Sequence, residues 1–298
     1  MIDLRDGDFT ATVDPVFGNN AFSLKLRDRE FLWTSPDFRS KPALGGVPLL
    51  APWANRIDGD SYFANGKRYH LNPDLGNLRR DGNGLAIHGL LAFVDGWHVT
   101  NQTDTSVTSR LDFWRHPDWT AQFPFAHTIE VTHRLFVGEL EVETKIQNLA
   151  EEPMPLCIGF HPYFQLPNSS RDEWTLRIAA RRAVQLNDKL TPTGETSPFD
   201  PATAHPLRAH CFDNVYCDLT GEEFAAESRD ARLSVRFGPK YSVAIVYAPP
   251  DKSCVCFEPM TALTNAFNLA HAGKYSLLKE IAPGDTWRES FWIRPELT

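Results

Sequence analysis

The sequence predicts an all-β fold, a large antiparallel β-sandwich, and three observations support this prediction. Apolar and polar residues alternate in many short runs along the chain. Glycine, proline, asparagine and aspartate separate these runs, as expected of turns. No segment of a dozen residues keeps its apolar residues at helical spacing. Alternation is the pattern of a strand with one buried face, and many short strands between turns are typical of a sandwich.

The clearest pair of strands is predicted in the middle of the chain. In Thr128–Val137 every second residue from Ile129 onward belongs to one face, which is apolar except for His133. After Gly138, apolar residues and charged residues alternate up to Ile146. A glycine between two alternating runs predicts a β-hairpin with one buried face.

Shorter runs of the same kind predict further strands toward the C-terminus. They are Trp174–Ile178, Leu233–Phe237, Val243–Tyr247, Cys254–Phe257 and Glu289–Ile293. The stretch Thr191–Pro206 is rich in proline, threonine, serine and aspartate, and we expect it to be an exposed excursion. Because no linker-like or low-complexity tract divides the chain, we expect residues 1–298 to form a single domain.

Composition excludes several functional classes. The chain has 298 residues, 42% of them hydrophobic, and a net charge of −8. Such a composition is that of a soluble globular protein, and the acidic balance argues against nucleic-acid binding and polybasic membrane contact. No secretory signal or membrane-spanning stretch is visible, so we expect a cytoplasmic protein. The five cysteines, an odd number, fit reduced thiols.

Two distant segments place a titratable residue before a proline within an apolar, strand-like run. Ile158–Phe164 contains His161 followed by proline, and Val255–Thr261 contains Glu258 followed by proline. A residue before proline favours extended backbone, and proline in a sheet occurs at edges and interruptions. Each segment therefore presents its titratable group at a discontinuity of a sheet. A histidine and a glutamate placed in this way suit a proton donor and a proton acceptor.

Other segments offer polar groups for a ligand. Asn55 and Arg56 follow Trp53 in an irregular stretch, and arginine suits bidentate contacts with neighbouring oxygens. His88 is followed by a glycine, which permits close approach to the imidazole. Asp213 lies among aromatic residues. Taken singly, each of these residues is more often a solvated or structurally hydrogen-bonded side chain than a ligand-binding one.

Several well-known catalytic patterns are absent from the sequence. We find no glycine-rich dinucleotide motif, no P-loop and no nucleophile elbow. The ten histidines include no pair at the spacing of a metalloprotease. The sequence therefore predicts chemistry without a metal or another cofactor.

Taken together, these segments resemble the aldose 1-epimerase (mutarotase) family. The matching stretches are Gly46–Ile57, Ile87–Gly89, His161–Leu166 and Glu258–Asn268, in this order. They span residues 45–268, and four weak motifs in the same order are fairly specific. The resemblance implies a galactose mutarotase-like supersandwich, which agrees with the β-sandwich predicted from the alternation.

The resemblance also implies a role for each residue. Glu258 matches the general base that takes the proton of the anomeric hydroxyl, and His161 matches the general acid that protonates the ring oxygen. His88 and Arg56, with Asn55 beside it, match substrate-binding residues, and Asp213 resembles an aspartate that holds sugar hydroxyls. Unperturbed pKa values near 4.3 and 6.5 allow an ionised glutamate and a protonated histidine together, and the nearby carboxylate should raise the histidine pKa modestly.

The sequence departs from the family pattern at three positions. Proline stands at position 162, Leu90 follows the His-Gly pair where the best-known galactose enzymes carry glycine, and Asn265 stands where many members carry aspartate. These departures leave the sugar open rather than the chemistry. The implied partner is a small sugar, with no nucleic acid and no membrane, bound by a monomer or a homodimer.

Other functions remain open at this stage. A hexose-6-phosphate 1-epimerase of the same fold would need basic residues for the phosphate, and Arg79-Arg80 and Arg181-Arg182 are candidates. A glycosidase could use Glu258 with Asp213 as its two carboxylates. A non-catalytic sugar-binding or sensing protein would keep the pocket without turnover.

Overall fold

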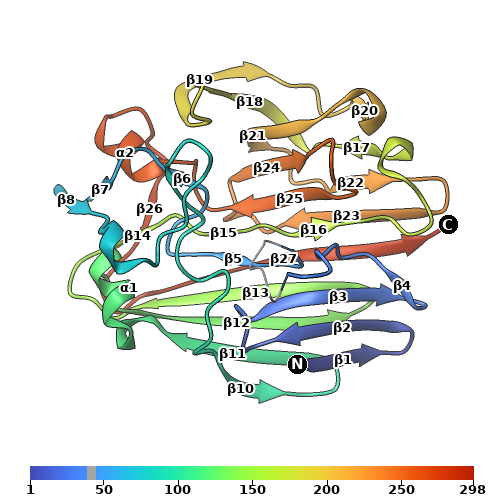
Figure 1. Cartoon of the computed structure of the whole chain (residues 1–298), viewed down its shortest axis with the longest axis horizontal. Coiled ribbons are helices and arrows are strands. Elements are labelled where there is room, and N and C mark those ends of the chain that lie inside the picture. Colours follow the sequence, from blue (N-terminus) through green and yellow to red (C-terminus); the bar gives the residue numbers. More distant parts are fainter. Residues whose placement is uncertain (39–44) are drawn as a thin grey trace.

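The computed structural model describes residues 1–38 and 45–298, and it confirms the all-β prediction. Two large antiparallel sheets dominate the molecule, and their strands run roughly parallel to the long axis in Figure 1. The nine-stranded sheet comprises, in spatial order, β10 (His98–Gln102), β11 (Ser106–Asp112), β12 (His127–Phe136), β13 (Glu139–Asn148), β27 (Thr286–Leu297), β23 (Ala231–Phe237), β22 (Phe224–Glu227), β17 (Thr175–Arg177) and β20 (Ala204–Pro206).

The eight-stranded sheet holds Glu258 and Asp213, and His161 lies between two of its strands. Its strands are, in spatial order, β19 (Pro192–Pro198), β18 (Ala180–Leu186), β21 (Phe212–Leu219), β24 (Val243–Ala248), β25 (Val255–Met260), β15 (Gly159–Phe160) and β5 (Leu49–Leu50), with β16 (Tyr163–Phe164) also paired to β25.

Smaller sheets and short helices complete the fold. The four-stranded sheet is β1 (Ile2–Asp6), β2 (Phe9–Asp14), β3 (Asn20–Leu26) and β4 (Arg29–Glu30). The two-stranded pairs are β6 (Arg56–Ile57) with β9 (Ala86–Ile87), β7 (Ser61–Ala64) with β8 (Lys67–His70), and β14 (Met154–Leu156) with β26 (Lys279–Ile281). The α-helices are α1 (Pro117–Gln122) and α2 (Ala266–His271), and the 3-10 helices are Pro73–Leu75, Phe113–Arg115, Arg171–Glu173 and Leu207–Ala209.

The predicted central hairpin is confirmed as β12 and β13. Ile129 pairs with Ile146 and Leu135 pairs with Leu140, and the register is continuous over the whole ladder. In β13 buried and partly exposed residues alternate strictly. Gly138 occupies the turn with a positive φ, which is the conformation that glycine adopts at little cost.

The stretch Thr191–Pro206 differs from the expected excursion. It contains two edge strands, β19 paired with β18 and β20 paired with β17. Prolines begin and end β19. Proline is tolerated there because the outer side of an edge strand needs no backbone donor.

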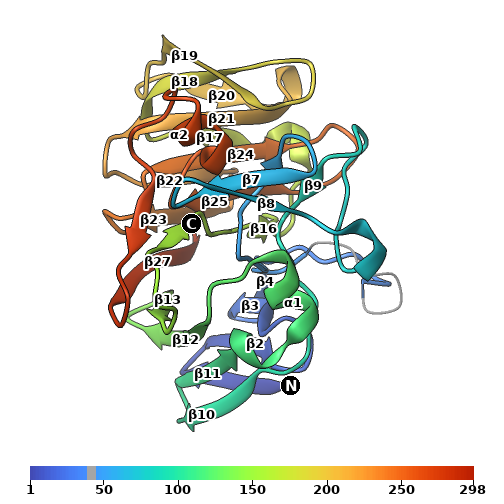
Figure 2. The same cartoon turned by 90° about the vertical axis from the view of Figure 1, so that its left-hand side faces the viewer.

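One apolar cluster connects the sheets. It includes Leu24 of the four-stranded sheet, Phe257 of the eight-stranded sheet and Phe291 of the nine-stranded sheet, all fully buried. Organisation as one domain stays a prediction. Within the described residues, neither α-helix is long and apolar enough to cross a bilayer. The two α-helices and the β7–β8 hairpin gather at one end of the strands, at the left in Figure 1 and facing the viewer in Figure 2.

Candidate active site

The sheet register places His161 directly opposite Glu258. Gly159 of β15 pairs with Met260 of β25, and Tyr163 of β16 pairs with Cys256 of the same strand. If the same register is counted across the gap between β15 and β16, His161 lies opposite Glu258. Proline 162 separates β15 from β16 because it has no N–H for the ladder. The two prolines noticed in the sequence therefore flank a single break beside β25.

The side chains of His161 and Glu258 meet at this break. His161 Nε2 lies 3.2 Å from Glu258 Oε1, and the side chains are only 7% and 1% exposed. Glu258 Oε2 and His161 Nδ1 are buried without a partner in the described structure. The Tyr163 ring stacks on the imidazole at 4.5 Å, and its hydroxyl lies 3.4 Å from His161 Nε2. The site thus pairs an acid with a base, and one buried polar atom of each has no hydrogen-bond partner among the described residues.

His88 lies next to His161 and adds a second imidazole to the site. Its ring contacts the His161 ring edge-to-face, with 5.2 Å between centroids. The backbone of His88 has a φ of 64°, which is uncommon for a residue other than glycine and occurs most often at functional sites. A Cβ on Gly89 would lie 2.2 Å from the Ala51 carbonyl oxygen, so only glycine permits the approach that turns His88 inward. The His88 backbone N–H donates to the Asn55 carbonyl at 2.9 Å.

Arg56 is held by its neighbours rather than free in solution. Its Nε donates to Asp81 Oδ2 at 2.6 Å, and its Nη1 donates to Asn55 Oδ1 at 3.1 Å. Burial favours a higher pKa for Asp81, but hydrogen bonds from Arg56 and from the backbone of Leu85 and Asn83 outweigh it and lower that pKa. Asn55 therefore orients the arginine with its side-chain oxygen, and its predicted contact with a ligand stays a prediction.

Asp213 shares the sheet face of Glu258. It pairs across β21 and β24 with Tyr247, which pairs with Cys256 of β25, two residues before Glu258. Residues opposite each other in antiparallel strands share a face, and so do residues two apart. Desolvation by the surrounding protein raises the pKa of Asp213, while the charge of Arg56 lowers it. The charges of Asp213 and Arg56 both act on Glu258.

Burial sets the protonation of the central pair, and this differs from the expectation. Desolvation lowers the pKa of His161 to about 3, although we expected the carboxylate to raise it. Desolvation and the charge of Asp213 raise the pKa of Glu258 well above its ordinary value. Both directions favour the uncharged forms, because a low-dielectric environment penalises either ion. Between the titrations of His161 and Glu258 the pair holds one proton, and burial favours a carboxylic acid beside a neutral imidazole.

The amide side chains that follow Glu258 in the sequence form their hydrogen bonds with other residues than His161 and Glu258. Asn265 Oδ1 accepts from the Asp58 N–H at 3.0 Å, and Asn268 Nδ2 donates to the Asp58 and Ser61 carbonyls. Asn268 lies in α2, a helix that the sequence patterns missed. These amides fix the turn before β7 instead of supplying hydrogen bonds at Glu258.

Further residues of the site were not identified from the sequence. Tyr247 approaches His161 edge-to-face with ring centroids 5.9 Å apart. Trp33 packs on Tyr163 at 5.7 Å, and Lys252 Nζ lies 5.8 Å above the indole. An aromatic wall of this kind suits the C–H faces of a sugar. The alternation of β24 places Tyr247 and Ile245 on one face, a signal that could have indicated Tyr247.

The two arginine doublets have different surroundings. Arg80 forms an ion pair with Asp60 at 2.9 Å and is exposed. Arg181 of β18 lies 3.7 Å from Asp218 of β21, and Arg182 of β18 donates to Thr196 of β19. Arg79 alone lies beside the site, where its charge acts on His88 and His161.

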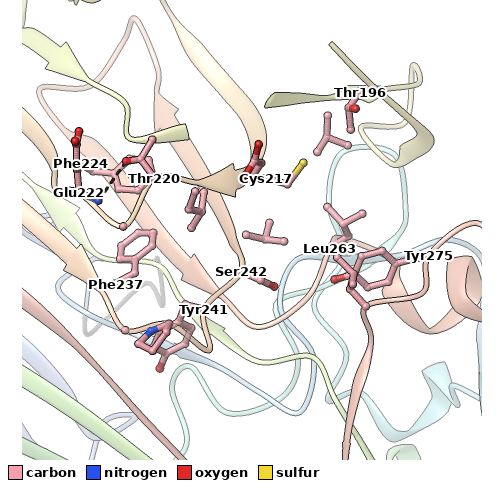
Figure 3. A pocket seen from close by; sticks show the side chains of 18 of the residues that line it. Thr196, Cys217, Thr220, Glu222, Phe224, Phe237, Tyr241, Ser242, Leu263 and Tyr275 are labelled. Atoms are coloured by element: carbon pink, nitrogen blue, oxygen red, sulfur yellow. Dashed lines mark hydrogen bonds between the residues drawn. The ribbon is translucent and has the colours of Figure 1, made fainter. Parts of the chain in front are cut away.

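A separate cavity lies away from the candidate residues. It has a volume of about 690 Å³ and is bounded mainly by apolar side chains from strands of both large sheets and from the loops around them. Figure 3 shows Phe224, Phe237 and Tyr241 at one end and Leu263 with Tyr275 at the other. None of the six candidate residues lines it. Within the described part of the chain, no group of three or more histidine, cysteine, aspartate or glutamate side chains is arranged to hold a metal ion.

Comparison with known proteins shows the family of this chain. Residues 2–294 match the sequence model of the family described as aldose 1-epimerase. The chain is 30% identical over 275 residues to the uncharacterized protein YihR of Escherichia coli (strain K12), covering 90% of this chain and 85% of that protein.

Solved structures show the same fold. A galactose mutarotase-like protein from Clostridium acetobutylicum matches with a TM-score of 0.87 at 21% identity, covering 99% of this chain and 95% of that one. A GalM/aldose epimerase homologue from C. elegans matches with a TM-score of 0.80 at 19% identity, covering 100% and 98%. These matches confirm the supersandwich fold, and with the full-length sequence match they show that the chain belongs to the aldose 1-epimerase family.

Proposed function

We propose that this protein is an aldose 1-epimerase that interconverts the α and β anomers of a sugar by general acid–base catalysis. The direct contact of His161 and Glu258, at 3.2 Å, carries this proposal. Mutarotation moves protons at two oxygens, the anomeric O1 and the ring oxygen, and both are bonded to C1. An acid and a base that serve one carbon must be neighbours, as these two side chains are.

The proposed reaction conserves the single proton of the pair. In the reactive tautomer Glu258 is a carboxylate and His161 an imidazolium. Glu258 takes the proton of O1, C1=O1 forms, the bond from C1 to the ring oxygen breaks, and His161 protonates the ring oxygen. Rotation about C1–C2 presents the other face of the aldehyde, and the reverse transfers close the ring. General acid–base catalysis of this kind typically contributes about 10²–10⁴-fold.

The protonation that burial favours for the pair supports this cycle. Ring opening leaves the pair as carboxylic acid and imidazole, which are the forms that burial favours. The same side chains reach the charged tautomer when the proton passes from Oε1 to Nε2 across their contact. The pair therefore alternates between its two forms without exchanging a proton with solvent.

The surrounding residues fit sugar binding. His88 adds a second imidazole beside His161, with its Nδ1 buried and unpartnered. Arg56 and Asp213 provide a hydrogen-bond donor and an acceptor on the Glu258 side. We assign Asn55 and Asp81 to positioning Arg56. The partner of Glu258 is an imidazole rather than a second carboxyl group, which supports an epimerase over a glycosidase.

Substitution of Glu258 tests the proposal. Glu258→Gln keeps the shape of the side chain but removes the base, so we expect anomer exchange to fall about 10²-fold or more, measured by polarimetry or exchange NMR. Glu280→Gln, at an exposed position on β26, is the matched control and should retain wild-type rates. Wild-type rates in Glu258→Gln would remove this residue from the role, and wild-type protein that accelerates no sugar would overturn the function.

A further inference from the structure

Arg79 is fixed against the imidazole side of the site. Its carbonyl oxygen accepts a hydrogen bond from the Ile87 N–H at 3.0 Å, which sets the arginine beside the residue that precedes His88. Its guanidinium stacks over the Phe93 ring at 4.7 Å from the centroid. Such stacking orients the planar group and leaves its edge free for hydrogen bonds.

The guanidinium of Arg79 has no acidic partner among the described residues. Its Nε is buried without a hydrogen bond, and it forms none of the ion pairs found there. Arg56 provides the contrast, because Asp81 neutralises it at 2.6 Å. Desolvation lowers the pKa of Arg79, so the protein holds this cation at a cost. This cation is half-buried and unpaired in a protein whose net charge is −8, and an anionic ligand would neutralise it.

The positive charges are distributed unequally around the central pair. The charges of Lys252 and Arg79 act on His161, whereas those of Asp213 and Arg56 act on Glu258. In the proposed reaction His161 serves the ring oxygen and Glu258 serves O1. The ring oxygen bridges C1 and C5, so the C6 substituent of a pyranose lies beyond the ring oxygen. In the orientation that the proposed reaction requires, the C6 substituent would therefore point toward the side of Arg79 and Lys252.

We infer that Arg79, assisted by Lys252, binds an oxyanion carried at C6, so that the preferred substrate is an acidic aldose. This inference rests on the proposed function and adds the class of substrate. The shared chemistry is a group with several acceptor oxygens, a phosphate ester or a carboxylate. Arginine binds either group with two parallel hydrogen bonds.

The test compares acidic and neutral substrates. Anomer exchange of glucose, glucose 6-phosphate and glucuronic acid is measured by NMR with wild-type protein, Arg79→Gln and Arg80→Gln. We expect wild-type kcat/KM to be higher for at least one acidic sugar than for glucose. Arg79→Gln should reduce the ratio of acidic to neutral kcat/KM about tenfold or more, the effect of one charge-assisted hydrogen bond. Arg80→Gln should leave the ratio unchanged, because Arg80 pairs with Asp60 on the surface.

The outcomes separate this inference from the function on which it rests. If wild-type protein accelerates none of the three sugars, the proposed epimerase function fails. If it accelerates glucose best, or if Arg79→Gln leaves the ratio at its wild-type value, the function stands and the anion inference is overturned. Should Arg79→Gln fold poorly, competitive inhibition of glucose exchange by inorganic phosphate in wild-type protein gives a second test. Inhibition that weakens with added sodium chloride supports the inference, and no inhibition contradicts it.

Discussion

The two large sheets each bury a histidine, and their difference shows what makes one of them a candidate for catalysis. His133 lies in β12, within a ladder whose register runs unbroken, and both of its ring nitrogens are buried without a partner. His161 lies where the ladder beside β25 is interrupted and faces Glu258. Burial lowers the pKa of both, to about 4 and about 3. A perturbed pKa alone therefore does not single out a candidate, whereas an opposed acid at a break in a sheet does.

Activity should separate the two histidines most strongly. We expect His161→Gln to lower kcat/KM for anomer exchange about 10²–10⁴-fold, because the ring oxygen loses its proton donor. His133→Leu should retain the wild-type value, since its ring reaches no substrate. Rate measurements at equal concentrations of folded protein provide the check, and equal losses in the two variants would contradict the comparison.

Substitution of a glycine should also cost more unfolding free energy beside the candidate site than in the β12–β13 turn. A Cβ at Gly89 would lie 2.2 Å from the Ala51 oxygen, while a Cβ at Gly138, in the β12–β13 turn, meets nothing within 4 Å. Both have positive φ, so Gly138→Ala should cost about 1 kcal/mol of unfolding free energy. Gly89→Ala should cost about 3 kcal/mol or more, because backbone must move as well. Urea unfolding of both variants tests this, and equal costs would show that the approach at Gly89 is not tight.

The pH dependence of activity should reflect the single shared proton. As pH rises through the raised pKa of Glu258, the pair loses that proton, and kcat/KM for a neutral aldose should fall about tenfold per pH unit. As pH falls toward about 3, His161 takes up a second proton and activity should fall again. Between these two limits the profile should be flat, with no step that comes from His161 itself. A titration of wild-type kcat/KM near pH 6.5 that disappears in His161→Gln would contradict the direction assigned to His161.

A change of stability with pH should come from His133. Its folded pKa of about 4 lies below the ordinary 6.5, so the unfolded chain binds the proton first and unfolding free energy falls as pH falls from 6.5 toward 4. At pH 5 this amounts to about 2 kcal/mol. His133→Leu should reduce the loss between pH 7.5 and pH 5 by that amount in urea unfolding. An unchanged loss would mean that His133 already carries a proton or is solvated.

Prediction from the sequence succeeded where the signal is local. Alternation around Gly138 identified the hairpin, and two residues that precede prolines identified the opposed pair. The prolines are informative because each removes a backbone donor from the same ladder. Family membership was also evident from the order of the motifs, which no single strand pattern supplies.

Features that depend on distant contacts could not be predicted. The partner of Arg56 is Asp81, and nothing in the spacing of these residues marks the pair. Asn265 and Asn268 bind the turn at Asp58, which comes close only in the folded chain. The lowered pKa of His161 depends on how deeply the fold buries it. Local patterns carry no measure of that depth.

His161 and Glu258 lie opposite each other in the sheet register, and this has a consequence for how the sequence of such a protein can diverge. Their separation is determined by the spacing of adjacent strands, which no loop controls. His88, Arg79 and Lys252 come from connecting segments outside the two large sheets. Under the proposed function, insertions and substitutions in those segments can therefore change which sugar binds. The geometry of proton transfer would stay the same, because the pairing of the strands determines it.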